Sequence, residues 1–160
     1  MKSKLQLFVS LTITFLIFKL GHSMTTTPGR PSGNGNPAIL LFLPLFIMLI
    51  VLIVQWCKVL DHKKFHMRTL IILSVICIAH QVMGVYYQII RYRSYRDYLA
   101  EVYKQQFGEI DWHYIHSITA GLSIHINNQF FNTNTYFMFV SFSLLIWSLS
   151  QIIMEIQKRR

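Results

Sequence analysis

The sequence predicts an all-α integral membrane protein, with three transmembrane helices after a signal peptide, or four if the N-terminal segment is retained. Of its 160 residues, 53% are hydrophobic and only 13% are charged, unlike a soluble globular protein. The apolar residues gather in long blocks, and the basic residues stand at the ends of those blocks. The net charge of +9 therefore indicates topology determinants. A nucleic-acid-binding surface is not expected, because it would need a basic stripe on a folded face.

Residues 1–23 have the layout of a secretory signal peptide. Lys2 and Lys4 precede an apolar run over 5–18, and the small residues Gly21 and Ser23 follow it. The sequence favours cleavage, and the alternative is a signal anchor that remains as an extra helix. In both cases residues 24–37, which are rich in Thr, Gly, Asn and Pro, form a flexible exoplasmic tether.

Three further apolar blocks predict transmembrane helices over residues 38–57, 69–90 and 136–154. We expect Pro44 to bend the first of them, because proline removes a helical hydrogen bond. The first block carries no line of polar residues, so we expect it to pack by shape alone or to face lipid.

The distribution of basic residues predicts the orientation in the membrane. The connection over 58–68 holds four Lys/Arg and one Asp, and the tail over 155–160 ends in three basic residues. The segment over 91–135 holds four basic and four acidic residues, so the loop and the C-terminus are expected in the cytoplasm. We expect the protein in the secretory pathway, at the plasma membrane or the endoplasmic reticulum. The topology determinants are Lys58, Lys63, Lys64, Arg68, Lys158, Arg159 and Arg160.

A line of small and polar residues runs along the span over 69–90, at intervals of three, four, three and four. Such residues concentrate where membrane helices meet, since lipid offers them no hydrogen bonds. Serines at spacing seven on the last span suit the same contact, so we expect these two spans to pair. The expected helix-interface residues are Ser74, Cys77, His80, Gln81, Gly84, Gln88, Ser141, Ser148 and Gln151.

His80 is the ionisable group within this line. An intramembrane histidine can mark a proton relay or a ligand site. No Asp or Glu of the sequence falls in mid-membrane to partner it. We therefore interpret His80 as neutral and hydrogen-bonded across the helix pair.

Residues 91–135 predict an amphipathic exoplasmic segment. Tyr92, Tyr95, Leu99 and Val102 have helical spacing, which favours a helix that continues from the second span with its aromatic face at headgroup level. Gly108 is expected to end this helix, and Asp111 to cap the next one. Histidines interrupt residues 111–126, which indicates an interfacial or re-entrant helix; a polar turn follows.

Candidate chemistry is sparse in this sequence. His113 and His116 are weak metal candidates, because no cysteine or positioned third ligand accompanies them. No metal and no cofactor is expected. Cys57, at the basic edge of a span, is a candidate for S-palmitoylation, although an unmodified cysteine is the preferred interpretation. No known catalytic motif occurs, so the chain is not expected to be an enzyme.

The leading functional hypothesis is a small multi-pass membrane protein that acts by helix–helix association, as an accessory or assembly subunit of a larger membrane complex. Its expected partners are the lipid bilayer and other membrane proteins or a second copy, with no nucleic acid. The polar line motivates this hypothesis, because it is too long to be satisfied by one facing helix of hydroxyls. The alternative is a homo-oligomeric channel or transporter-like protein with a polar path along the second span. An intramembrane enzyme that uses His80, or His113 and His116, comes third.

Overall fold

The computed structural model describes residues 2–30, 35–60 and 65–159, and within these ranges the chain forms helices and no strands. Four helical segments are long and apolar enough to cross a membrane, so the prediction of an all-α chain with helices of membrane-spanning length is confirmed. In chain order the elements are α1 Lys2–Ser23, the 3-10 helix η1 Pro37–Leu41, α2 Phe42–Leu60, α3 Met67–Phe107, α4 Trp112–Ile118, the 3-10 helix η2 Ile124–Ile126, α5 Asn127–Phe130 and α6 Thr133–Lys158.

Local sequence signals explain where the helices begin and end. α3 ends at Gly108, whose φ of 87° places it in the left-handed region that favours glycine, and Asp111 caps α4, as predicted. Asn132 begins α6 with a capping box to Thr135. Pro44 is the third residue of α2, directly after η1. A proline is tolerated in the first turn of an α-helix, and Pro44 lies where η1 passes into α2.

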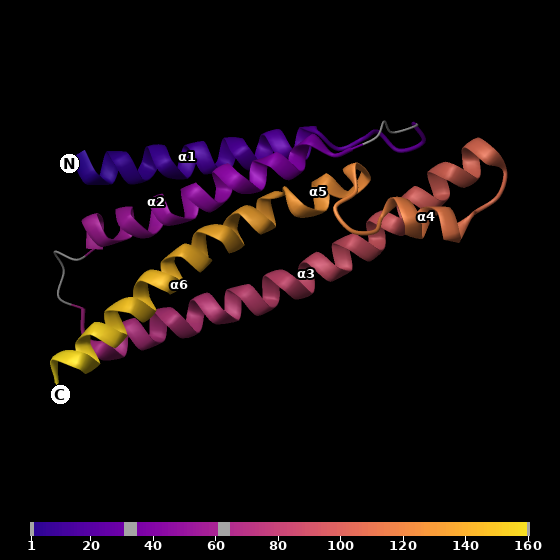
Figure 1. The fold of residues 1–160 in the computed structure, drawn as a ribbon. Helices are drawn as coiled ribbons and strands as arrows, with labels where there is room; N and C mark the ends of the chain where they lie inside the picture. Colours follow the sequence, from indigo (N-terminus) through magenta and orange to yellow (C-terminus); the bar gives the residue numbers. More distant parts are fainter. Residues whose placement is uncertain (1, 31–34, 61–64, 160) are drawn as a thin grey trace.

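The long helices are arranged around α6 (Figure 1). α1 and α2 form one antiparallel pair, and α6 lies between this pair and α3. α6 contacts all three of the other long helices, and its most extensive contact is with α3. The beginning of α1, the end of α2, the beginning of α3 and the end of α6 share one end of the bundle, which we call the inner end.

At the opposite, outer end, α3 extends beyond the bundle and α4 folds back on it (Figure 1). Leu99 of α3 and Ile115 of α4 are fully buried in this contact. The hydroxyls of Tyr92 and Tyr95 donate to the carbonyls of Thr119 (2.6 Å) and His125 (2.9 Å). The aromatic face predicted to lie at headgroup level is therefore covered in large part by residues of the same chain.

The segment predicted as a polar turn with an aromatic pair, residues 126–135, anchors α1 through one of those aromatic rings. Phe131 is only 1% exposed and packs edge-on against Phe18 of α1, with ring centroids 6.0 Å apart. A Cβ on Gly21 would lie within 2.4 Å of the Phe131 ring, so α1 and this ring approach each other too closely for a larger residue. The Nδ1 atom of His22 lies 2.8 Å from the Phe131 carbonyl oxygen. α1 is therefore built into the packing of the bundle.

Candidate functional site

The polar line of α3 lies against α6 over its whole length. Near the inner end, the hydroxyls of Ser74 and Ser148 are 2.9 Å apart, and both side chains are buried. Cys77, one turn further along, is also buried, and Gln151 is half-buried. Two hydroxyls that bond each other leave no polar atom facing hydrocarbon, which explains why serines occupy these positions.

The middle of the line is a cluster of three side chains and one carbonyl. The Gln81 amide nitrogen donates to the Met138 carbonyl (2.8 Å) and to the Ser141 hydroxyl (2.7 Å). The Nδ1 atom of His80 lies 2.8 Å from the same hydroxyl. His80 is thus hydrogen-bonded across the helix pair, the geometry that our interpretation of a neutral histidine requires.

The outer part of the line is joined by amides. A Cβ on Gly84 would lie 2.6 Å from the Met138 sulfur, so glycine allows the two helices to approach there. Asn134 donates to the Gly84 carbonyl at 3.0 Å. The Gln88 nitrogen donates to the Gln129 carbonyl (2.8 Å), and its oxygen accepts from Asn132 (3.2 Å) and Asn134 (3.3 Å). The hydrogen-bonding groups of the line therefore find partners within the chain, because α5 and the beginning of α6 supply amides in addition to the hydroxyls expected from the last span.

α2 contributes a polar contact that sequence reasoning missed. The Trp56 indole nitrogen donates to the Ser143 hydroxyl at 3.0 Å, and Ser143 is fully buried. The first span was expected to pack by shape alone or to face lipid, and this bond is a correction to that expectation. The signal in the sequence was weak, since an indole N–H near the end of a span commonly faces the membrane surface.

The predicted topology determinants lie at the inner end where the structure describes them. Lys58 lies in the last turn of α2, Arg68 in the first turn of α3, and Lys158 is the last residue of α6, with Arg159 directly after it. Arg159 forms an ion pair with Glu155 at 3.2 Å. Cys57, the lipidation candidate, is half-buried near the same end. Three further determinants lie outside the described residues: Lys63, Lys64 and Arg160.

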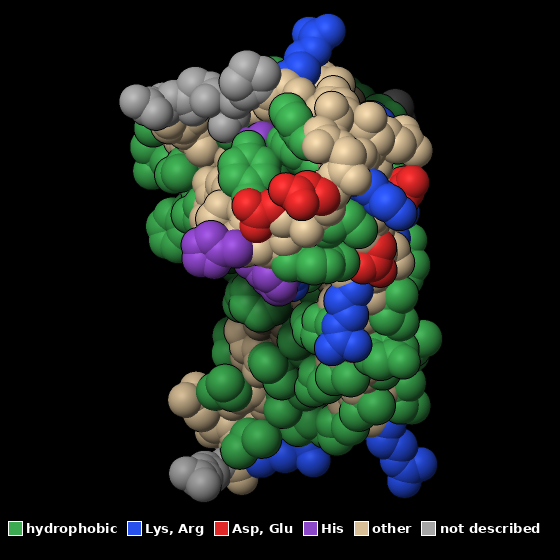
Figure 2. Space-filling model, turned by 90° about the vertical axis from the view of Figure 1, so that its right-hand side faces the viewer, with side chains coloured by type: hydrophobic (Ala, Val, Ile, Leu, Met, Phe, Trp, Pro, Cys, Tyr) green, Lys and Arg blue, Asp and Glu red, His purple; other side chains and the backbone are tan. Residues whose placement is uncertain are grey.

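The outer end carries carboxylates and histidines on its surface, as Figure 2 shows. His113 and His116 are exposed, and the Nε2 atom of His116 lies 2.8 Å from an Arg96 nitrogen. Because a guanidinium can only donate, the Arg96 N–H occupies the lone pair of the His116 Nε2 atom, which a metal ion would need. Within the described ranges, no group of three His, Cys, Asp or Glu side chains could hold a metal ion.

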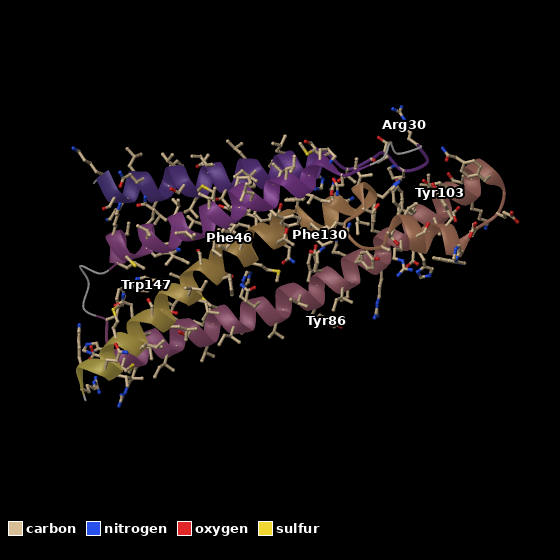
Figure 3. The ribbon with its side chains drawn as sticks, in the orientation of Figure 1. Arg30, Phe46, Tyr86, Tyr103, Phe130 and Trp147 are labelled. Carbon is tan, nitrogen blue, oxygen red and sulfur yellow. The ribbon has the colours of Figure 1, made fainter. Side chains whose placement is uncertain are left out.

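Two adjoining hollows of about 410 and 380 Å³ lie between α2 and α3, with α6 as their floor. We call them together the α2–α3 groove. They share Phe42, Phe130, Thr135 and Met138, and Figure 3 labels Phe46 and Phe130 along their edge. The walls are almost entirely carbon. The other lining residues are Phe18, Leu45, Phe46, Leu49, Gln81, Val85, Gln88, Ile89, Tyr92, Ile126, Gln129, Phe131, Phe139 and Phe142.

A cavity of about 350 Å³ lies between α1, α3 and the beginning of α6, near the outer end. We call it the α1–α3 cavity. Unlike the groove, it has basic side chains in its wall. The lining residues are Phe15, Phe18, Lys19, His22, Tyr87, Arg91, Phe131, Asn132, Thr133, Asn134, Tyr136 and Phe137.

Along the α3–α6 contact, the described groups are hydroxyls, amides and one histidine, and they bond one another. No protein-family model, no curated protein and no solved structure matches this chain. Function is therefore inferred from the residues and their contacts alone.

Proposed function

We propose that this chain is a four-span membrane protein that acts as an accessory or assembly subunit, and that its α2–α3 groove receives a transmembrane helix of the complex it serves. The observation that supports this most is the groove itself. α6 is flanked by α2 on one side and by α3 on the other, yet its face between them is left open to the surroundings over two adjoining hollows. A helix laid there would complete a layer around α6.

The span count in this proposal differs from the favoured signal-peptide hypothesis. Thr14 and Phe18 of α1 are 0% and 5% exposed, and the Tyr136 hydroxyl of α6 donates to the Leu11 carbonyl at 3.3 Å. Removal of residues 1–23 would uncover Phe131 and Tyr136, which suit contact with a helix better than contact with lipid headgroups. We therefore propose that α1 is retained as the first span.

A retained α1 agrees with the charge pattern. The N-terminus, with Lys2 and Lys4, would lie in the cytoplasm together with the 58–68 connection and the C-terminus. Residues 24–36 and the segment between α3 and α6 would face outward. The intact mass of the purified protein tests retention directly, because cleavage would remove 23 residues. Protection of an N-terminal epitope from external protease would test whether the N-terminus lies on the cytoplasmic side of the membrane. A mass without residues 1–23 would refute the four-span part of the proposal.

The lining of the groove has the chemistry of a helix-binding surface. Leu45, Phe46 and Leu49 line one wall at spacings of one and three residues, which is one face of α2. The amides on the α3 wall, Gln81 and Gln88, already bond within the chain. The gain from binding would therefore come from shape and dispersion, the forces that hold apolar membrane helices together.

A pair of substitutions on α2 tests the groove. Leu49→Trp would fill it, whereas Ile47→Trp places a similar bulk on a residue that is 53% exposed and does not line it. We expect Leu49→Trp to release proteins that co-purify with the wild-type chain in mild detergent, and Ile47→Trp to retain them. Equal recovery of partners with both variants would refute the groove as the binding surface.

The channel hypothesis has less support from the geometry. A polar path along α3 would need Ser74, Gln81 and Gln88 to face water, yet each bonds to α5 or α6. We expect no ion flux in liposomes that contain the purified protein.

A further inference from the structure

The α1–α3 cavity differs from every other hollow described here in its charge. Lys19 of α1 and Arg91 of α3 line it, and none of its twelve lining residues is acidic. We propose that this cavity binds the anionic phosphate headgroup of a membrane lipid, with the acyl chains along its aromatic wall. This proposal rests on the retention of α1, which supplies Lys19 and His22.

The two cations are available to a ligand. Among the residues that the structure describes, neither Lys19 nor Arg91 forms an ion pair. The Lys19 ammonium lies 5.8 Å from the centre of the Phe15 ring, a contact that leaves its three N–H groups free to donate elsewhere. Two cations from different helices that line one cavity repel each other, and an anion between them would remove that repulsion.

The wall also holds a neutral donor that suits a phosphate. The Thr133 hydroxyl stands in the first turn of α6, where the helix dipole adds a smaller positive potential. Asn134 and His22 line the same wall, but the Asn134 amide donates to Gly84 and Gln88, and the His22 Nδ1 atom bonds to the Phe131 carbonyl. An oxyanion with several acceptor oxygens can use such a mixed set of donors better than a single carboxylate can.

The position of the cavity indicates an amphiphile. Lys19 follows the apolar run of α1, and Arg91 follows Ile90 at the end of the apolar part of α3, so both stand at the level where headgroups meet hydrocarbon. Phe15 and Phe137 line the part of the same cavity that lies deeper along α1 and α6, and Phe137 is 55% exposed. Basic pockets between membrane helices are suited to phosphate headgroups, and the aromatic wall favours a lipid over free phosphate.

Binding can be measured on the full-length protein in nanodiscs or in mild detergent. Native mass spectrometry, or fluorescence of a labelled lipid, would compare phosphatidylglycerol with phosphatidylcholine. We expect a clear preference for phosphatidylglycerol. Lys19→Gln and Arg91→Gln should each weaken its binding about fivefold, and the double variant about 25-fold, from the usual contribution of one basic residue at a lipid surface.

The chain offers a matched control. Arg93 is exposed on the same helix, two residues from Arg91, and does not line the cavity, so Arg93→Gln should bind within about twofold of wild type. The pair Lys19→Arg and Arg91→Lys keeps the charges and should retain binding, which separates loss of charge from loss of folding.

Several results would overturn the inference. Equal affinity for phosphatidylcholine, or equal weakening by Arg93→Gln and Arg91→Gln, would exclude a headgroup site in this cavity. Inorganic phosphate should compete only weakly; full displacement by millimolar phosphate would show an oxyanion site without a lipid component. The intact mass distinguishes the two proposals. Absence of residues 1–23 refutes this inference and the four-span part of the proposed function, whereas their presence without lipid preference refutes this inference alone.

Discussion

Replacement of Gln81 by leucine tests whether the polar line holds α3 to α6. The variant removes two interhelical hydrogen bonds, to the Met138 carbonyl and to the Ser141 hydroxyl. Such bonds contribute about 0.6 kcal/mol on average in membrane proteins and at most about 1.7 kcal/mol. Two of them sum to about 1 to 3 kcal/mol.

The structure favours the lower half of this range. Ser141 also donates to the Met138 carbonyl at 3.1 Å and lies 2.8 Å from His80, so neither group is left unbonded in the Gln81→Leu variant. The large penalty for an orphaned buried polar group is therefore avoided. We expect a loss of about 1 to 1.5 kcal/mol in the free energy of unfolding.

Steric trapping of the protein in mixed micelles, which measures the free energy of reversible unfolding, would measure this loss. Val82→Leu is the control, because Val82 is 65% exposed on the neighbouring position of the same helix and should change stability by less than about 0.5 kcal/mol. A double-mutant cycle with Ser141→Ala would isolate the coupling between the two side chains. If Gln81→Leu were as stable as Val82→Leu, these amides would not join the helices.

Three further outcomes are expected. Ile115→Ala should cost about 2 to 4 kcal/mol and speed hydrogen exchange over residues 95–118 but not over α6, because Ile115 is fully buried against α3 beyond the bundle. Burial lowers the pKa of His125 in the folded chain below its usual 6.5. As the pH falls, the unfolded chain therefore takes up a proton on His125 before the folded chain does. The stability of the outer segment is full above about pH 6.5 and falls as the pH drops towards the lowered pKa of the folded chain. Protection factors at pH 7.5 and 5.5, which are exchange rates corrected for the intrinsic rate at each pH, would show this, and His125→Gln should remove the difference between them. Asn132→Ala should lower the free energy of unfolding by about 1 kcal/mol, measured in the same micelles, since Asn132 caps α6.

Much of the fold could be predicted from the sequence because it depends on local or one-dimensional patterns. Apolar blocks and flanking charges indicate membrane helices whatever the neighbours are. Gly108 and Asp111 mark helix ends through backbone geometry alone. The interval pattern of Ser74, Gln81 and Gln88 likewise marks one helix face, because helical period is a property of the single chain segment.

The partners of that face could not be predicted, since they come from segments distant in sequence. The sequence predicts Asn132 and Asn134 in a polar turn, yet their side chains hydrogen-bond to Gln88. Phe131 read as part of the same turn, yet it is the ring that α1 packs against. Which side chain fills the space above a glycine such as Gly21 is decided by tertiary packing.

The sequence by itself determined that this chain forms apolar helices long enough to span a membrane and which of their faces are polar, because hydrophobicity and helical period are carried by consecutive residues. Tertiary structure alone decided that the polar line is bonded within the chain, that α6 keeps an open groove, and that Lys19 and Arg91 share a cavity. Each of these depends on which helices lie side by side, and helix adjacency is set by the sum of many distant contacts.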